Sequence, residues 1–174
     1  MANDQFETML TGGHPNSLGR TIKVVDLVLA NPDRFEELYL CYRSQDEVVR
    51  LRVSNAMRRV EAEQHDLLVP YIDRFIEEIG ALDQLSAQWT LAKLFEALRP
   101  DMMPVQEAGA LAVMQRNLAE HDNWIVLNNT MEALFNWSYD NAELRSWLIP
   151  HLQRFSKDNR KSVSSRAKKL IAKS

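Results

Sequence analysis

Apolar side chains recur at steps of three and four residues along nearly the whole chain. This spacing places them on one face of an α-helix, whereas a half-buried strand would alternate apolar and polar residues. β-Branched residues are scattered, and no Asn-Gly or Asp-Gly pair marks a tight hairpin. The pattern therefore predicts an all-α chain.

Helix boundaries follow from residues that satisfy or lack backbone hydrogen bonds. A first helix is expected from about residue 17 to residue 30. Asn31 followed by Pro32 predicts the start of a second helix, because asparagine caps free amides and proline has no N–H group. Ser44 and Glu47 stand three residues apart, which predicts a capping box at the start of the next helix.

One helical unit then repeats at intervals of 37 to 39 residues. The helix that begins near Glu47 has its expected buried positions at Val49, Val53, Ala56, Met57 and Val60. Shifts of 38, 77 and 114 residues bring mostly apolar side chains to these positions: Ala87, Leu91, Leu94, Phe95 and Leu98; Val126, Thr130, Ala133, Leu134 and Trp137; and Val163, Ala167, Leu170 and Ile171. This period is the size of a helical-hairpin repeat. The second helix of each hairpin is termed the B helix and the first the A helix.

The A helices keep the same period less regularly. "LVPYIDRF" at 68 to 75 matches "LIPHLQRF" at 148 to 155 in its leucine, proline, arginine and phenylalanine. Pro70 is expected in the first turn of its helix, where a missing N–H group breaks no intrahelical bond. Pro150 is expected about two turns inside its helix, which predicts an irregularity at residues 147 to 150. A third A helix is expected after Pro104.

The repeated unit has a recognisable sequence. "DEVVRLRVSNAMRRV" at 46 to 60 resembles the second helix of HEAT and armadillo-type repeats through Asp46, Val49, Arg50, Ala56 and Met57. The resemblance implies a right-handed α-α superhelix (α-solenoid) of about four HEAT-like helical hairpins plus an N-terminal helix. It covers residues 17–174, and residues 1–16, which contain "GGHPN", are expected to form a flexible leader.

"QWTLAKLF" at 88 to 95 resembles the armadillo helix whose tryptophan, with an asparagine four residues later, lines a peptide-binding groove. Trp89 matches that tryptophan, and Lys93 stands at the asparagine position. Trp124 and Asn128 have the same spacing but fall about four residues early in the repeat register.

The resemblance also implies where a partner would bind, because stacked hairpins curve so that their B helices line a concave side. With about 100° per residue, position 51 of the first B helix and its neighbours point away from the core. The candidate partner-binding residues on this face are Arg50, Leu51, Asn55, Arg58, Trp89, Lys93, Glu96, Asn128, Glu132 and Phe135. A polar face interrupted by Leu51, Trp89, Met131 and Phe135 is typical of a peptide groove, since aromatic anchors supply energy and polar neighbours fix register.

Other positions for these side chains remain open. Trp89 could pack against a neighbouring repeat instead of facing the groove. The apolar segment "NWIVLNNTMEALFNW" favours the core for Trp124, Phe135 and Trp137. Asn128 and Asn129 either face the groove as hydrogen-bonding groups or satisfy a neighbouring turn, because a buried amide needs partners.

Composition limits the class of protein. The 174 residues are 45% hydrophobic and 26% charged, which suits one well-buried domain. No apolar run reaches the roughly 18 residues of a membrane span, and the acidic N-terminus does not resemble a secretory leader. A cytoplasmic location without membrane partners is expected. Cys41, the single cysteine, is expected to be a small buried side chain without chemistry.

Charge is distributed unevenly along the chain. From Arg154 onward eight basic residues stand against Asp158 alone, a net charge of +7, which leaves −10 for the remaining chain. Such a distribution attracts an acidic partner at one end and a basic one at the other, although a charged last helix is also typical of a solvated cap.

No catalytic signature is present, and no catalytic residue, metal or cofactor is expected. The four histidines, His14, His65, His121 and His151, show no metal-binding spacing, and the phosphate-binding and nucleophile-elbow motifs are missing. The expected function is therefore a non-enzymatic scaffold or adaptor that binds a peptide or helical segment of another protein along the B-helix face.

Nucleic-acid binding is the alternative. Bacterial alkylpurine DNA glycosylases are built from HEAT-like repeats, and the resemblance to them is architectural. A discontinuous basic track beside Trp89 would be formed by Arg50, Arg52, Arg58, Arg59, Lys93, Lys168 and Lys169. The charge of −10 before Arg154 and a pI near 5.8 are unfavourable for phosphate binding.

Overall fold

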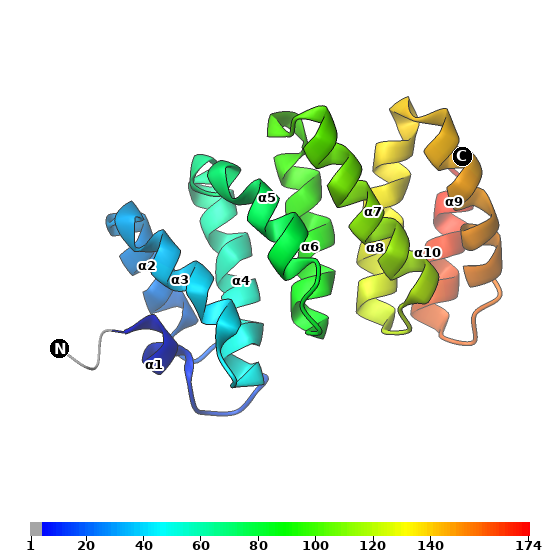
Figure 1. The fold of residues 1–174 in the computed structure, drawn as a ribbon. Coiled ribbons are helices and arrows are strands. Elements are labelled where there is room, and N and C mark those ends of the chain that lie inside the picture. The colour runs from blue at the N-terminus through cyan, green and yellow to red at the C-terminus, as the bar shows by residue number, and fades with distance from the viewer. Residues whose placement is uncertain (1–4) are drawn as a thin grey trace. The chain divides into compact units, whose positions relative to one another are not determined.

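A computed structural model of the chain describes residues 5–174. Over this range the chain consists of helices joined by turns, without a β-strand, so the prediction of an all-α chain is confirmed. The α-helices are α1 (Phe6–Leu10), α2 (Thr21–Ala30), α3 (Phe35–Leu40), α4 (Glu47–Glu63), α5 (Ile72–Arg74), α6 (Leu85–Leu98), α7 (Pro104–Glu120), α8 (Trp124–Trp137), α9 (Ala142–Phe155) and α10 (Lys161–Ile171) (Figure 1). None of these helices is long and apolar enough to cross a membrane.

The chain divides into two compact units, Met1–Thr90 and Leu91–Ser174, and the boundary falls within α6. In the first unit α2 packs beside α4, and α1 contacts both (Figure 1). The α2–α4 contact buries apolar side chains at helical spacing, among them Val24, Val28, Val53 and Met57. The core of this unit thus uses the predicted buried face of the first B helix.

Part of the expected flexible leader is folded. Residues 6 to 10 form α1, whose Phe6, Met9 and Leu10 are buried, so the description of residues 1–16 as a flexible leader is wrong for this segment. The Phe6 amide donates to Glu37 Oε1 at 2.8 Å, and the Arg34 guanidinium lies 3.9 Å from the centre of the Phe6 ring. A helix this short is stable because tertiary contacts hold it, which its local sequence does not reveal. Residues 1–4 lie outside the described residues.

The start of α4 is capped differently from the prediction. Asp46 is the N-cap residue, and its Oδ1 accepts a hydrogen bond from the Val48 amide at 2.8 Å. Ser44 Oγ accepts from the Asp46 amide at 3.2 Å instead of capping the helix. The predicted Ser44–Glu47 capping box is therefore wrong, because the aspartate two residues later takes the capping position.

The A helix expected at residues 68 to 75 is the least regular part of the first unit. Two 3₁₀ turns, His65–Leu67 and Val69–Tyr71, precede the short α5, and a π-helical segment follows at Phe75–Ile79. Pro70 lies inside the second 3₁₀ turn. In the π-helical segment the Gly80 amide donates to the Phe75 carbonyl at 2.9 Å, five residues back. Such wide turns depend on tertiary packing and are not readable from periodicity.

The second unit contains two helical hairpins. α7 packs against α8 and α9 against α10, while α8 also contacts α9 and α10 (Figure 1). The start of α7 at Pro104 confirms the prediction for the third A helix. In this unit α8 and α10 therefore lie next to each other.

The predicted irregularity at residues 147 to 150 is wrong. α9 runs without a break from Ala142 to Phe155 with Pro150 inside it. Pro150 and Ser146, which lies four residues earlier, are both exposed, so water can reach the carbonyl that lacks its proline partner. The rings of Trp147 and His151 contact each other across this turn, with centroids 4.2 Å apart and planes tilted by 37°.

Candidate functional site

An open hollow of about 170 Å³ lies in the first unit, beside the beginnings of α4 and α6. It contains Leu51 and Trp89, the two apolar residues of the first unit that were predicted to bind a partner. The lining residues are Pro15, Glu47, Val48, Leu51, Gln84, Leu85, Ser86 and Trp89, and this site is called the Leu51–Trp89 hollow. A cavity of about 150 Å³ accommodates a benzene ring in another protein, so the hollow has room for one large apolar side chain.

Helix geometry brings these side chains to one place. On α4, Val49 and Val53 are buried. Leu51 lies between them in the sequence but on another face of the helix, and it is partly exposed. On α6, Ala87 and Leu91 are buried, and Trp89 is only partly buried. Glu47 precedes Leu51 by four residues, and Leu85 precedes Trp89 by four, so each pair shares one helix face. The prediction that Trp89 is separated from the core side chains of its helix is consistent with this placement.

The floor of the hollow exposes apolar surface to solvent. Leu85 is 45% exposed, and Leu51, Val48 and Trp89 are partly exposed. Covering such surface is favourable, because complete burial of one large apolar side chain contributes about 1.5–3 kcal/mol. The hollow can therefore gain affinity from a single apolar side chain of a ligand.

The lining of the hollow carries one acidic group, and the Arg50 guanidinium lies beside the lining on Gln84. Glu47 is the one ionisable residue of its lining; it is exposed, and its carboxylate makes no hydrogen bond or ion pair with any residue of the described range. The polar atoms beside it are engaged: Arg50 Nε donates to Gln84 Oε1 at 2.8 Å, and Gln84 Nε2 donates to Ser86 Oγ at 3.0 Å. A ligand that presents a cation next to its apolar group would complement Glu47.

The remaining predicted residues of the first unit do not line the hollow. Arg50 is partly buried, and its Nη1 donates to the Ser44 carbonyl at 2.6 Å. Asn55 accepts a hydrogen bond from Arg59 Nε at 2.7 Å through Oδ1. Arg58 is exposed. These three side chains remain candidates for contacts at the edge of a bound segment.

The predicted residues of the second unit have diverse surroundings. Lys93 and Glu96 are partly buried on α6, and Asn136 Nδ2 donates to Glu96 Oε1 at 2.5 Å. Glu132 on α8 is paired with Arg166 on α10. Asn128 is 8% exposed, and its Oδ1 finds no hydrogen-bond donor among the described residues.

Phe135 is not available to a ligand. Its side chain is 3% exposed and packs edge-on against Tyr139, with ring centroids 5.3 Å apart. Met131, predicted to interrupt the same polar face, is also buried. The burial of Phe135 agrees with the apolar segment around it, which favoured the core, and not with its selection as a partner contact. The placement of Met131 on an accessible face is wrong, because the core of the second unit extends over more of α8 than the repeat register predicted.

The two other aromatic residues of α8 behave differently. Trp137 is buried as predicted, and the Arg99 guanidinium lies 4.7 Å from its ring. Trp124 is 49% exposed at the first position of α8, so its prediction as a core residue is wrong. The prediction from the apolar segment failed for Trp124 because a side chain in the first turn of a helix has no preceding turn to pack against.

The sequence reasoning missed several members of the hollow, chiefly Pro15, Glu47 and Leu85. Glu47 was interpreted as a capping residue, and Leu85 lay just before the helix that was considered. The four-residue spacings from Glu47 to Leu51 and from Leu85 to Trp89 were the available signal. Pro15 had no such signal, because a loop residue carries no periodicity.

A second hollow of about 250 Å³ in the first unit is lined by Tyr39, Tyr42, Arg43, Glu78, Ile79 and Leu82. Its charged groups already pair with one another: Tyr39 donates through its hydroxyl to Glu78 Oε2 at 3.2 Å, and Arg43 lies 3.6 Å from the same oxygen. Desolvation by burial raises the pKa of Tyr39, so this phenol keeps its proton. The cluster holds α3 against the π-helical segment.

Candidate reactive groups are not gathered into a centre. Burial raises the pKa of the Cys41 thiol to about 12, and its Sγ lies 3.3 Å from the Glu37 carbonyl. Among residues 5–174, no three histidine, cysteine or acidic side chains are arranged to hold a metal ion. His65 is paired with Glu61 at 2.8 Å within one helical turn.

No protein-family model matches the chain, and comparisons with curated proteins and with solved structures also find no match. The function is therefore inferred from the geometry of the Leu51–Trp89 hollow.

Proposed function

We propose that this chain is a HEAT-like helical-repeat protein that binds a segment of a partner protein. The segment carries a large apolar side chain next to a lysine or arginine. The apolar side chain enters the Leu51–Trp89 hollow, and the cation lies beside Glu47. The partner is held without chemical change, so the chain acts as a scaffold or adaptor.

The observation that carries the proposal is the hollow itself. Leu51, Leu85 and Trp89 expose apolar surface around a space the size of one side chain, and Glu47 is the charged group of its lining. A partly exposed tryptophan beside an apolar pocket is the usual composition of a binding hot spot, in which a few residues supply most of the affinity. The net charge of −6 on residues 1–90 also favours a basic partner segment.

The repeat architecture supports the same proposal. The hairpins α7–α8 and α9–α10 pack with their B helices adjacent, which is the arrangement inside an α-solenoid. Proteins of this class use the exposed face of their B helices for extended partner segments. Asn55 and Arg58, one and two turns beyond Leu51 on α4, would then contact the segment outside the hollow.

Nucleic-acid binding is less well supported by the surroundings of the basic residues. Arg52, at the centre of the proposed track, is buried, and Arg50 is engaged by Gln84 and Ser44. A phosphate group would have to displace these contacts. Arg58, Arg59 and Lys93 lie on α4 and α6 but are not part of the lining of the hollow. Lys168 and Lys169 lie on α10.

A peptide selection tests the proposal. A library of random twelve-residue peptides is selected on the wild-type protein, and the most enriched peptide is synthesised with a fluorescein label for anisotropy titrations. We expect it to contain an apolar residue beside a lysine or arginine. Trp89→Ala should weaken its binding by about 2 kcal/mol or more, and Leu51→Glu by about tenfold or more.

The matched control is Val105→Ala, because Val105 is an exposed apolar residue far along the sequence at the start of α7. This variant should bind the peptide like the wild type. Equal affinity of all four proteins, or failure to select any peptide, would refute the proposal. Tighter binding to duplex or single-stranded DNA than to any peptide, weakening steeply with salt, would favour the nucleic-acid function instead.

A further inference from the structure

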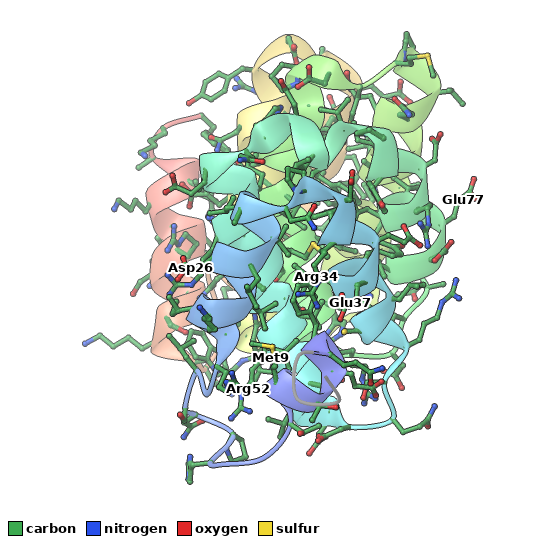
Figure 2. All side chains as sticks on the ribbon, turned by 90° about the vertical axis from the view of Figure 1, so that its left-hand side faces the viewer. Met9, Asp26, Arg34, Glu37, Arg52 and Glu77 are labelled. Carbon is green, nitrogen blue, oxygen red and sulfur yellow. The ribbon has the colours of Figure 1, made fainter. Side chains whose placement is uncertain are left out.

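Arg52 is the most deeply buried charged residue of the described chain, with 1% of its surface exposed. It follows Leu51 on α4, and Figure 2 shows it beside the loop that joins α1 to α2. Its guanidinium makes no ion pair with a described carboxylate. It donates instead to four backbone carbonyls: Leu10 at 2.8 Å and Gly12 at 2.6 Å from Nη1, His14 at 3.3 Å from Nη2, and Ser17 at 3.2 Å from Nε.

A buried cation without an acidic partner is costly unless its N–H groups are satisfied. Here the N–H groups of the Arg52 guanidinium are satisfied by backbone carbonyls within the eight consecutive residues from Leu10 to Ser17. A planar guanidinium with five donors suits this arrangement, whereas a lysine could not reach all four acceptors at once. Arg52 therefore fixes the backbone conformation of this loop.

The backbone of the loop is shaped around this side chain. Gly12, Gly13 and Gly19 have positive φ angles of 77°, 76° and 53°. A Cβ atom at Gly19 would lie 2.8 Å from Arg52 Cζ and 2.8 Å from Nη1, closer than real Cβ atoms approach. A Cβ atom at Gly12 would meet nothing within 4 Å. Glycine is thus favoured at position 19 for two reasons: its positive φ angle, and the close approach of the loop to the guanidinium.

The same loop forms one wall of the binding site. Pro15 lies between the two carbonyls of His14 and Ser17 that Arg52 holds, and Pro15 lines the Leu51–Trp89 hollow. All side chains of residues 11 to 20 are exposed, so no buried side chain of the loop itself anchors this wall.

We propose that Arg52 is the positioning residue of the binding site: it fixes the loop of residues 11–19 so that Pro15 closes one side of the hollow around the apolar side chain of the partner. This inference rests on the proposed function. The adjacent residues Leu51 and Arg52 on α4 then have different roles. Leu51 contacts the apolar side chain of the partner, and Arg52 holds the loop that carries Pro15.

Two variants that act on the loop by different routes test this role. Arg52→Lys keeps the charge and removes most of the hydrogen bonds. Gly19→Ala leaves the Arg52 residue unchanged, but the added Cβ atom displaces its guanidinium from the loop. Gly12→Ala is the matched control, because it imposes a similar backbone penalty at positive φ without the collision.

Three measurements are made on each protein. NMR hydrogen exchange follows the amides of Asn16, Ser17 and Gly19, which donate to His14 Nδ1, the His14 carbonyl and Ser17 Oγ. The indole N–H resonance of Trp89 reports on the hollow, and fluorescence anisotropy gives the affinity for the selected peptide. Urea denaturation shows whether each variant is folded.

In Arg52→Lys and Gly19→Ala we expect exchange of the loop amides to rise by about tenfold, since one lost bond from a charged donor shifts an opening equilibrium by this factor. The Trp89 resonance should move, and the peptide should bind about tenfold more weakly. Gly12→Ala carries the backbone penalty without the collision, so its changes in all three measurements should be clearly smaller than those of Gly19→Ala. If Arg52→Lys does not fold, Gly19→Ala decides the outcome.

Unchanged exchange or an unchanged Trp89 resonance in the folded variants would overturn the inference. Faster exchange with full peptide affinity would overturn it as well, because the wall would then not matter for binding. If the wild type binds no peptide, the proposed function fails by itself; exchange and the Trp89 resonance then still decide whether Arg52 holds the wall.

Discussion

Arg50 on α4 donates a hydrogen bond from Nε to Oε1 of Gln84, 34 residues later, at a distance of 2.8 Å. Since Arg50 also holds the Ser44 carbonyl and Gln84 holds Ser86, this contact connects the segment before α4 with the start of α6. The Leu51–Trp89 hollow lies between these two helix beginnings. Its dimensions therefore depend on a polar contact that is not part of its apolar floor.

A double-mutant cycle measures this contact. We expect Arg50→Met and Gln84→Ala each to lower the free energy of unfolding, with a coupling energy of about 1 kcal/mol between them. Urea denaturation of the wild type, both single variants and the double variant gives this value. Strict additivity of the two losses would show that the hydrogen bond contributes nothing.

Removing the charge of Glu47 should weaken binding of a basic peptide without unfolding the protein. We expect Glu47→Gln to lower the affinity for the selected peptide by about threefold to tenfold at low salt, and the loss to shrink as salt screens the charge. Anisotropy titrations at two salt concentrations test this. Glu63→Gln is the control, because Glu63 is exposed at the far end of the same helix. An equal effect of both variants would contradict a specific role for Glu47.

The opposite placement of Phe135 and Trp124 on α8 predicts opposite effects of truncation. Phe135→Ala removes a buried ring and should cost about 3–5 kcal/mol of stability. Trp124→Ala changes a side chain that is half exposed and should stay within about 0.5 kcal/mol of the wild type. Thermal or urea unfolding distinguishes the two, and a larger loss for Trp124→Ala would mean that the second unit packs differently.

Asp158 should make stability depend on pH. Hydrogen bonds from the Arg160 side chain and amide, at 2.8 to 2.9 Å, lower the pKa of Asp158 from 3.8 to about 2. Because the folded pKa is the lower one, ionised Asp158 stabilises the fold above pH 3.8, and this contribution disappears as the pH falls toward 2.

The variant Asp158→Asn lacks that contribution. We expect it to be less stable than the wild type by about 1 kcal/mol at pH 7, a modest value because the pair lies near the surface. Urea denaturation from pH 7 down to pH 2.5 should show the difference between the two proteins decreasing. A difference that is constant over this range would assign the loss to packing instead of charge.

The sequence was informative where helices bury a regular apolar face. The buried residues Val49, Val53 and Val60 on α4 and Leu91, Leu94 and Leu98 on α6 were all predicted, since their spacing alone identifies a helix and its inner side. Where several elements cover one helix, as on α8, the same spacing underestimated burial. Met131 became a core residue through contacts with other helices, whereas the apolar segment around Phe135 had already favoured its burial.

The candidate site shows the same limit. Leu51 and Trp89 could be selected because each interrupts a helical pattern, and the structure brings them together in one hollow. Arg52 could not be recognised, because its position on a helix surface is typical of a solvated arginine. Its burial results from a loop that lies about forty residues earlier in the sequence.

The carbonyls that Arg52 gathers precede it by 35 to 42 residues. During synthesis the segment from Leu10 to Ser17 is therefore complete well before the side chain that fixes it exists. Such distant contacts form late, after the entropy of closing the intervening chain has been overcome. The growing chain can complete this corner of the protein only once α4 has emerged. The Leu51–Trp89 hollow is therefore finished from a later helix back to an earlier loop.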